Sequence, residues 1–288
     1  MKMLSVPVRV VGPGSQPDEE SLQYLDIPRD MNTFRMPLVP ERVDAEALSE
    51  SRAMLQEFLE ALDSWDPATG EMGPRIDISG LSPAAIEITD QMLGEGEVSI
   101  KVDGARKAHI QESVFAGIWR VCELDAEDRL IADWIEAAPL PAIVLEVARV
   151  AAVPSPAPVA LPEGTMNSPA LLTEIADRMR QRQPGNVAHV INLTLFPLTP
   201  EDHRVLEQAL PTGPVGIISR GFGNCRISST LAQDVWRVQY FNTMNTLILN
   251  TLEIVEAPEV ALAAVEDLVD SHERLAELVE WMGESCTA

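Results

Sequence analysis

The hydrophobic pattern of this chain occurs twice. Apolar residues recur at helical spacing from Asp44 to about Leu62, and a second helical stripe runs from Leu171 to Met179. Each stripe is followed by short segments in which apolar and polar residues alternate, as is typical of half-buried strands. The two halves of the chain therefore predict the same kinds of element in the same order.

A shift of 117 residues brings the two halves into register without an insertion, and about one aligned position in four is identical. We infer two copies of one structural unit. The identical pairs include Ser51/Ser168, Pro83/Pro200, Gly96/Gly213, Ile100/Ile217, Gly104/Gly221, Leu130/Leu247, Ile131/Ile248 and the triplets Trp119-Arg120-Val121 and Trp236-Arg237-Val238.

Each copy is predicted to fold in the order α-β-α-β-β-β-β-α. The second helix of each copy has a strong start signal, Ser82-Pro83 in one and Thr199-Pro200 in the other. The hydroxyl can cap a backbone N–H that lacks a partner in the first turn, and proline has no N–H to satisfy there. Four consecutive strands after that helix favour an antiparallel sheet with helices on one face, so the fold class is α+β.

Two further helices are expected at the end of the second copy. Pro258 begins the first of them. The last is predicted from Asp270 or Ser271 to Gly283, because Asp270 and Glu273 have the spacing of a capping box.

The predicted organisation has four segments. They are a proline-rich extended segment (1–45), a first α+β repeat (46–150), a connector rich in proline and alanine (151–167), and a second repeat with a C-terminal helix (168–288). Two such repeats could pack face to face and leave a groove for a peptide.

The chain is strongly acidic. Its 288 residues include 21 Lys and Arg against 45 Asp and Glu, which gives a formal net charge of -24 and a pI of about 4.4. Because such a charge repels phosphate backbones, we expect no nucleic-acid partner. The acidity is consistent with solubility alone or with attraction to a basic segment of a partner protein.

Targeting and membrane signals are weak. The apolar run near residue 1 is interrupted by Pro7 and Arg9 and is too short for a secretory signal. The longest apolar region, 138–161, contains Glu146 and Arg149, so no membrane insertion is expected. We expect a cytoplasmic protein.

The common catalytic and metal-binding motifs do not occur in the sequence. It has no nucleophile elbow, no phosphate-binding loop with its lysine and no Cys-x-x-Cys, and no two histidines stand three or four residues apart. The sequence therefore predicts no enzyme activity, no cofactor and no metal site. The cysteines are odd in number and far apart, which indicates a reducing compartment and no disulfide framework: Cys122, Cys225 and Cys286.

The segment GFGNCRISST differs most between the copies, since the first copy has GARKAHIQES in its place. Residues kept in both copies are expected to serve the scaffold, as Trp119 and Trp236 do in the core, so a segment distinctive of one copy is a candidate for partner binding. The candidates are Phe222, Gly223, Asn224, Cys225 and Arg226. Arg226 could lower the pKa of the Cys225 thiol, or Cys225 could be a small half-buried residue of a β-hairpin.

Several long stretches carry a family resemblance. They are GFGNCRISST, VWRVQYFNTMNTLILNTLEIVEAPEVALAA and EDLVDSHERLAELVEWM in the second copy, LGEGEVSIKV and IQESVFAGIWRV in the first, and GPGSQPDEESLQYLDIP with MNTFRMP near residue 1. The second-copy stretches resemble the C-terminal region of the HupH/HyaF family of hydrogenase expression/formation proteins. The first copy resembles a more degenerate occurrence of that region.

This resemblance implies a cytoplasmic, non-catalytic maturation factor for an uptake NiFe hydrogenase. It implies two partners, the precursor of the iron–sulfur small subunit before its export and a thioredoxin-like co-chaperone. An acidic surface would suit a precursor that carries a basic twin-arginine signal. Two alternatives are a thiol-dependent redox factor acting through Cys225 and an iron–sulfur carrier using Cys122, Cys225 or Cys286.

Overall fold

The computed structural model describes residues 44–69, 72–221 and 223–285. The predicted extended segment 1–45 lies almost entirely outside these residues. The α-helices are α1 (Ala45–Asp63), α2 (Pro83–Leu93), α3 (Ala142–Ala151), α4 (Ser168–Gln181), α5 (Pro200–Ala209) and α6 (Val265–Ser285), and short 3-10 turns are η1 (Pro67–Thr69), η2 (Leu193–Leu195) and η3 (Glu259–Ala261).

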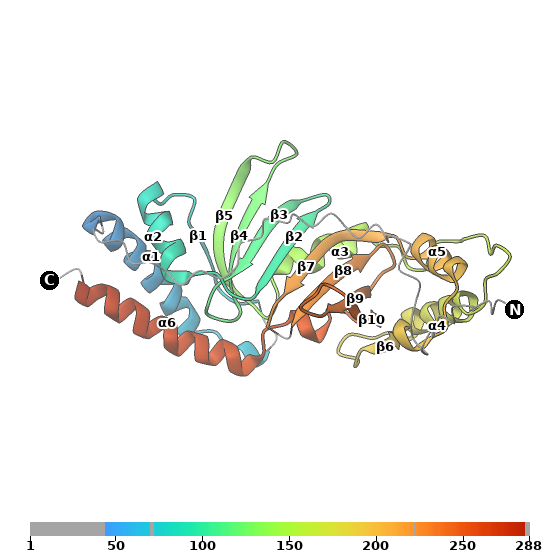
Figure 1. Cartoon of the computed structure of the whole chain (residues 1–288). Coiled ribbons are helices and arrows are strands. Elements are labelled where there is room, and N and C mark those ends of the chain that lie inside the picture. Colours follow the sequence, from blue (N-terminus) through green and yellow to red (C-terminus); the bar gives the residue numbers. More distant parts are fainter. Residues whose placement is uncertain (1–43, 70–71, 222, 286–288) are drawn as a thin grey trace, which may run out of the picture. The chain divides into compact units, whose positions relative to one another are not determined.

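Ten strands form one antiparallel sheet in the order β1-β5-β4-β3-β2-β7-β8-β9-β10-β6 (Figure 1). The strands of the first copy are β1 (Arg75–Asp77), β2 (Val98–Asp103), β3 (Lys107–Glu112), β4 (Ile118–Leu124) and β5 (Leu130–Ala137). Those of the second copy are β6 (His189–Asn192), β7 (Thr212–Ser219), β8 (Asn224–Thr230), β9 (Val235–Phe241) and β10 (Leu247–Ile254).

The predicted α+β class is confirmed, and so is the order α-β-α-β-β-β-β-α in each copy, where α6 is the last helix of the second copy. The copies join edge to edge through β2 and β7, where Ile100 pairs with its own counterpart, Ile217. Val98 pairs with Ser219 and Val102 with Val215, so equivalent positions run outward from that pair in opposite directions. A local two-fold axis therefore passes through the middle of the sheet, and the two copies do not adopt the face-to-face packing that the sequence left open.

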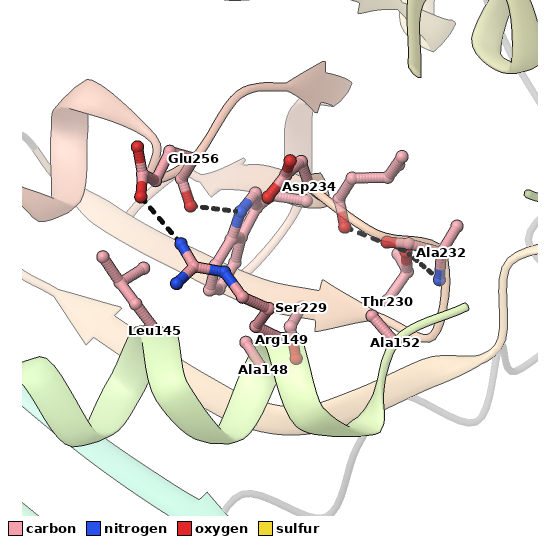
Figure 2. Close-up of a pocket in the computed structure, with 11 residues that line it drawn as sticks. Leu145, Ala148, Arg149, Ala152, Ser229, Thr230, Ala232, Asp234 and Glu256 are labelled. Carbon is pink, nitrogen blue, oxygen red and sulfur yellow. Dashed lines mark hydrogen bonds and ion pairs between the residues drawn. The ribbon is translucent and has the colours of Figure 1, made fainter. Parts of the chain in front are cut away.

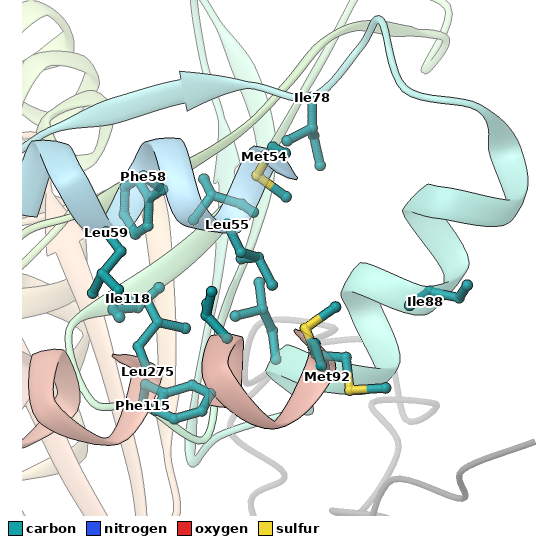
Figure 3. Packing of buried hydrophobic residues seen from close by; sticks show 14 of the residues in the cluster. Met54, Leu55, Phe58, Leu59, Ile78, Ile88, Met92, Phe115, Ile118 and Leu275 are labelled. Atoms are coloured by element: carbon teal, nitrogen blue, oxygen red, sulfur yellow. The ribbon is translucent and has the colours of Figure 1, made fainter. Parts of the chain in front are cut away.

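Helices lie on both faces of the sheet, so the expectation of a single helical face is wrong. On one face α3 packs over the centre, with Val144 and Val147 buried against Ile217 and the tryptophans Trp119 and Trp236. On the other face α1, α2 and α6 cover the outer strands of the first copy, and α4 and α5 cover those of the second. Figure 3 shows the first of these outer clusters, where Phe58 of α1 packs near Leu275 of α6.

The C-terminal helix α6 packs on α1, and therefore on the first copy (Figure 1). It begins at Val265, five residues before Asp270, so the predicted capping box lies inside the helix and the predicted start is wrong. The segment after Pro258 forms only the turn η3, although its counterpart in the first copy is the helix α3. Both α3 and η3 contact β7 near the local axis, so α3 already occupies the space that a second helix would need.

Two identical serines join the helix pairs of the two copies. Ser51 of α1 shares a buried hydrogen bond of 2.8 Å with Thr89 of α2. At the equivalent position, the Ser168 hydroxyl at the start of α4 donates to Asp202 of α5, also at 2.8 Å. In both copies the buried serine therefore binds a polar partner on the second helix of the pair.

The identical glycines Gly96 and Gly213 also have a structural reason. A Cβ atom on Gly96 would lie 2.1 Å from the carbonyl oxygen of Ser113. A Cβ atom on Gly213 would lie 2.9 Å from the carbonyl oxygen of Thr230, the residue that corresponds to Ser113. In both copies the chain passes too close to a neighbouring backbone for any side chain.

Candidate functional site

The centre of the sheet has one face on which no described helix packs. On the α3 side, strand residues such as Ile100 and Ile217 are almost completely buried. On the opposite side, twelve residues of six neighbouring strands lie in two rows across the sheet, and all are at least partly exposed. The rows are Cys122, His109, Lys101, Gly216, Ser228, Arg237 and Arg120, Gln111, Ser99, Ile218, Arg226, Gln239.

We call these twelve residues the open face. Four of them are cationic at neutral pH, Lys101, Arg120, Arg226 and Arg237, and none is Asp or Glu. In the whole chain, acidic residues outnumber basic ones by 45 to 21. The open face therefore has the opposite charge balance to the rest of the protein.

On the first-copy side of the open face, the charge of Arg120 is neutralised by carboxylates of the same copy. The Arg120 guanidinium donates to both carboxylate oxygens of buried Asp133, at 3.1 and 2.7 Å, and also pairs with Asp90 of α2. Burial raises the pKa of the neighbouring Cys122 thiol to about 11, against the opposing effect of the Arg120 charge. Arg120 thus ties β4 to β5 and α2, and its charge is largely satisfied there.

The second-copy side differs because Asn250 stands where the first copy has Asp133. The matching arginine, Arg237, therefore has a neutral amide at the position of that buried carboxylate. Next to it on β8, the Arg226 guanidinium lies over the Phe241 ring, 4.6 Å from its centroid. This contact is a cation–π interaction, which holds the side chain in place without cancelling its charge.

The five predicted binding residues do not form one surface. Phe222 lies outside the described residues. Gly223 has a φ of 93°, a conformation that favours glycine, and it leads into Asn224, which is exposed at the start of β8. Arg226 belongs to the open face, whereas Cys225 points to the opposite face and is completely buried. Lys101, also on the open face, was missed because only the β2–β7 pairing brings the two copies together. Arg237 was missed because it is identical in both copies, and shared residues were assigned to the scaffold.

The two described thiols are not arranged for redox or cluster chemistry. Burial raises the pKa of Cys225 to about 11, although a hydrogen bond with Tyr240 opposes the shift. Of the two alternatives, lowering of this pKa by Arg226 is wrong, because adjacent strand residues point to opposite faces. Cys225 is instead a small, fully buried residue of the β7–β8 hairpin. Cys122 lies on the other face of the sheet, with three strands between β4 and β8, so the two cannot share a cluster. Cys286 lies outside the described residues.

A small pocket lies beside the last turn of α3, on the face that carries Cys225 (Figure 2). Arg149 of α3 reaches across its rim to Glu256 at 2.8 Å, and Arg182 pairs with Asp234 at 3.3 Å. The space is about 20 Å³, enough for about one water molecule. It does not admit a substrate.

Within 44–69, 72–221 and 223–285, no three His, Cys, Asp or Glu side chains gather in a way that could hold a metal ion. No helix in the same ranges is long and apolar enough to cross a membrane. In the described part of the chain, the open face is therefore the main candidate for function.

Glu112, at the end of β3, is a buried acid with a consequence for stability. Burial raises its pKa to about 7 even though the Gly117 N–H donates to its carboxylate at 3.1 Å, and Glu97 and Asp267 add to the rise. Because the pKa of Glu112 is higher in the folded state than in the unfolded state, its protonated carboxyl contributes fully to stability below about pH 4.5. This contribution is lost as the pH rises through 7. The expected loss is on the order of 3 kcal/mol.

We therefore expect Glu112→Gln to flatten the fall in unfolding free energy between about pH 5 and pH 8, measured by urea denaturation at each pH. Glu127→Gln, at a side chain that is 67% exposed, is the matched control and should leave the slope unchanged. Equal slopes in wild type and Glu112→Gln would show that this carboxyl is not the cause.

Comparison with known proteins places the chain in a family. The model of the family described as "HupH hydrogenase expression protein, C-terminal conserved region" matches residues 48–151 and 165–282. The chain belongs to the HupH family of hydrogenase expression proteins. The two matched segments of this HupH family member correspond to its two copies, and the resemblance seen in the sequence is confirmed.

Relatives of this HupH family member match over almost their whole length. The hydrogenase expression/formation protein HoxQ of Cupriavidus necator is 43% identical, over 98% of this chain and 99% of the relative. HupQ of Azotobacter chroococcum, with the same description, is 41% identical over 93% of this chain and 95% of the relative. The hydrogenase-1 operon protein HyaF of Escherichia coli is 31% identical over 96% of each chain.

Proposed function

We propose that this protein is a non-catalytic accessory factor of NiFe-hydrogenase maturation, which binds the precursor of the iron–sulfur small subunit in the cytoplasm before export. The observation that carries the proposal is the match to relatives named hydrogenase expression/formation proteins over 98% of the chain. The geometry supports a binding role, because the described residues offer a broad polar surface and a pocket of only about 20 Å³.

The charge of the protein supports a precursor as the partner. A net charge of -24 attracts a basic segment over several ångströms and raises the rate of encounter at low salt. A small-subunit precursor with a twin-arginine signal offers such a segment. We propose a thioredoxin-like co-chaperone as a second partner in the same complex.

The test is co-purification with the tagged full-length chain. The small-subunit precursor, the same subunit without its signal peptide and the large subunit are each mixed with it at 50 and 500 mM salt. We expect the precursor to be retained, more strongly at 50 mM salt, and the large subunit to be lost at both. Absence of precursor retention at both salt concentrations, with the protein folded by circular dichroism, would overturn the proposal.

A further inference from the structure

The open face combines three properties that suit a protein ligand. It spans six strands, which is roughly 24 Å at the usual strand spacing. The described helices border it without packing on it, α2 from the first copy and α4 and α5 from the second. Apart from Gly216 and Ile218 its residues are polar or cationic, with serine, glutamine and arginine side chains that can donate hydrogen bonds.

We propose that the open face binds an acidic segment of the partner protein, with Lys101, Arg226 and Arg237 as its cationic contacts. This inference deepens the proposed function and depends on it for the identity of the partner. Charge complementarity selects the occupant, because the twelve residues of the face include four cations and no carboxylate within a chain of net charge -24. Carboxylates beside the face compensate part of this charge, since Asp133 and Asp90 pair with Arg120 and Asp103 lies 3.5 Å from Lys101, whereas Arg226 packs on an aromatic ring and keeps its charge. A basic segment would be repelled here and attracted to the acidic remainder of the surface.

Lys101 and Arg226 are held on the open face in different ways. Lys101 is near the local axis, with 48% of its side chain exposed, and it pairs with Asp103 of the same strand at 3.5 Å. Arg226 is held by Phe241 and still carries its charge. A guanidinium held in this way loses little rotational freedom when it binds a carboxylate in a two-pronged contact. Ser228 and Gln239 flank it and can serve backbone groups of the ligand.

The scarcity of lysine makes the contact easy to map. The chain has three lysines, Lys2, Lys101 and Lys107, and only Lys101 lies on the open face. Zero-length carbodiimide coupling joins a lysine amine to a carboxylate that it touches. In the complex of the full chain with the small-subunit precursor, we expect peptide mass spectrometry to find Lys101 joined to Asp or Glu of the precursor.

Lys101→Arg is the control for this crosslink. The arginine keeps the charge and cannot form the amide, so binding should persist while the crosslink disappears. Crosslinks to the precursor through Lys2 or Lys107 alone, with none through Lys101, would overturn the inference.

Charge reversal gives an independent test. Lys101→Glu with Arg226→Glu should weaken binding of the precursor at least tenfold in isothermal titration. A matched control is Arg178→Glu with Arg180→Glu, two exposed residues of α4 outside the open face, which changes the net charge by the same amount and should stay within twofold. Equal weakening by both double variants would show that only net charge matters and would overturn the inference.

A fluorescein-labelled decaglutamate peptide separates this inference from the proposed function. We expect it to bind the wild type and the α4 control in fluorescence anisotropy, and to lose binding with Lys101→Glu and Arg226→Glu. Decaglutamate binding without precursor binding would remove the proposed partner and keep the acidic-ligand site. Precursor binding that the open-face variant does not weaken would remove the site and keep the proposed function.

Discussion

Replacing Trp119 with alanine is expected to lower the free energy of unfolding by about 3–5 kcal/mol. The ring is fully buried, and its indole N–H donates to the carbonyl oxygen of Ala138 at 2.8 Å. Alanine would leave a cavity beneath α3 and remove the donor from that carbonyl. Trp236 occupies the equivalent position, donates to the carbonyl oxygen of Glu256 at 3.1 Å, and should respond in the same way.

The shape of the transition carries as much information as its midpoint. Both tryptophans belong to one core cluster, which includes side chains of β2 and β7 on either side of the local axis. We therefore expect urea unfolding, followed by far-ultraviolet circular dichroism, to remain a single transition in the wild type and in both variants. Trp281→Ala, at a side chain that is 43% exposed, is the control and should cost less than about 1 kcal/mol.

Two outcomes would contradict this expectation. Separate transitions, each shifted by only one of the substitutions, would mean that the repeats unfold as independent domains. A loss below about 1 kcal/mol for Trp119→Ala would mean that the cluster beneath α3 is not the main core of the sheet.

The sequence was most informative where local chemistry decides the structure. Ser82-Pro83 and Thr199-Pro200 were predicted to start helices, and in both cases the hydroxyl caps a backbone N–H of the first turn. The strands β4 and β9 have the same length and lie 117 residues apart, as the register requires. Caps, prolines and alternation depend on neighbours in sequence, so they can be read without the tertiary structure.

Features that depend on contacts between the copies could not be predicted. The segment after Pro258 has the same register as α3 and yet forms only η3, because α3 crosses the local axis and packs on β7. The start of α6 at Val265 follows from its packing across the first copy, whereas the capping-box pattern at Asp270 is a local signal that tertiary contacts override. When contacts with the other copy decide where a helix begins or ends, the sequence of that helix contains no signal for the boundary.

The residues of the candidate site could also be predicted only in part, because contacts between the copies place some of them on the open face. Arg226 was identified because its segment differs between the copies, and it does lie on the open face. Cys225 was chosen with it, although strand alternation alone places two adjacent residues on opposite faces. Lys101 differs between the copies as well, since Ile218 stands at its position, but only the β2–β7 pairing shows that it shares a surface with Arg226.

The second large effect concerns Asp202, which is completely buried at the start of α5. One carboxylate oxygen accepts from the backbone N–H groups of Met166, Asn167 and Ser168 at 2.9–3.0 Å, and from the Ser168 hydroxyl. The other accepts from the Thr199 N–H at 3.1 Å. A single side chain therefore fixes the end of the connector, the start of α4 and the first turn of α5.

Asp202→Ala is expected to lower the free energy of unfolding by about 3–5 kcal/mol, because it leaves four backbone donors without their acceptor in a buried region. Asp177→Ala, on the exposed side of α4, is the matched control and should change it by less than about 1 kcal/mol. Urea denaturation at pH 7 compares the two. A loss for Asp202→Ala no larger than that of the control would show that water or other groups can satisfy those donors.

The acid dependence gives a second readout of the same carboxylate. Burial tends to raise the pKa of Asp202, but the hydrogen bonds from Ser168, Thr199 and Met166 outweigh it and hold that pKa well below its usual range. A folded pKa below the unfolded one means that the stabilisation is present above about pH 4 and is lost as the pH falls below it. The wild type should therefore lose more stability than Asp202→Ala between pH 5 and pH 2.5, and parallel losses would assign the acid sensitivity to other carboxylates.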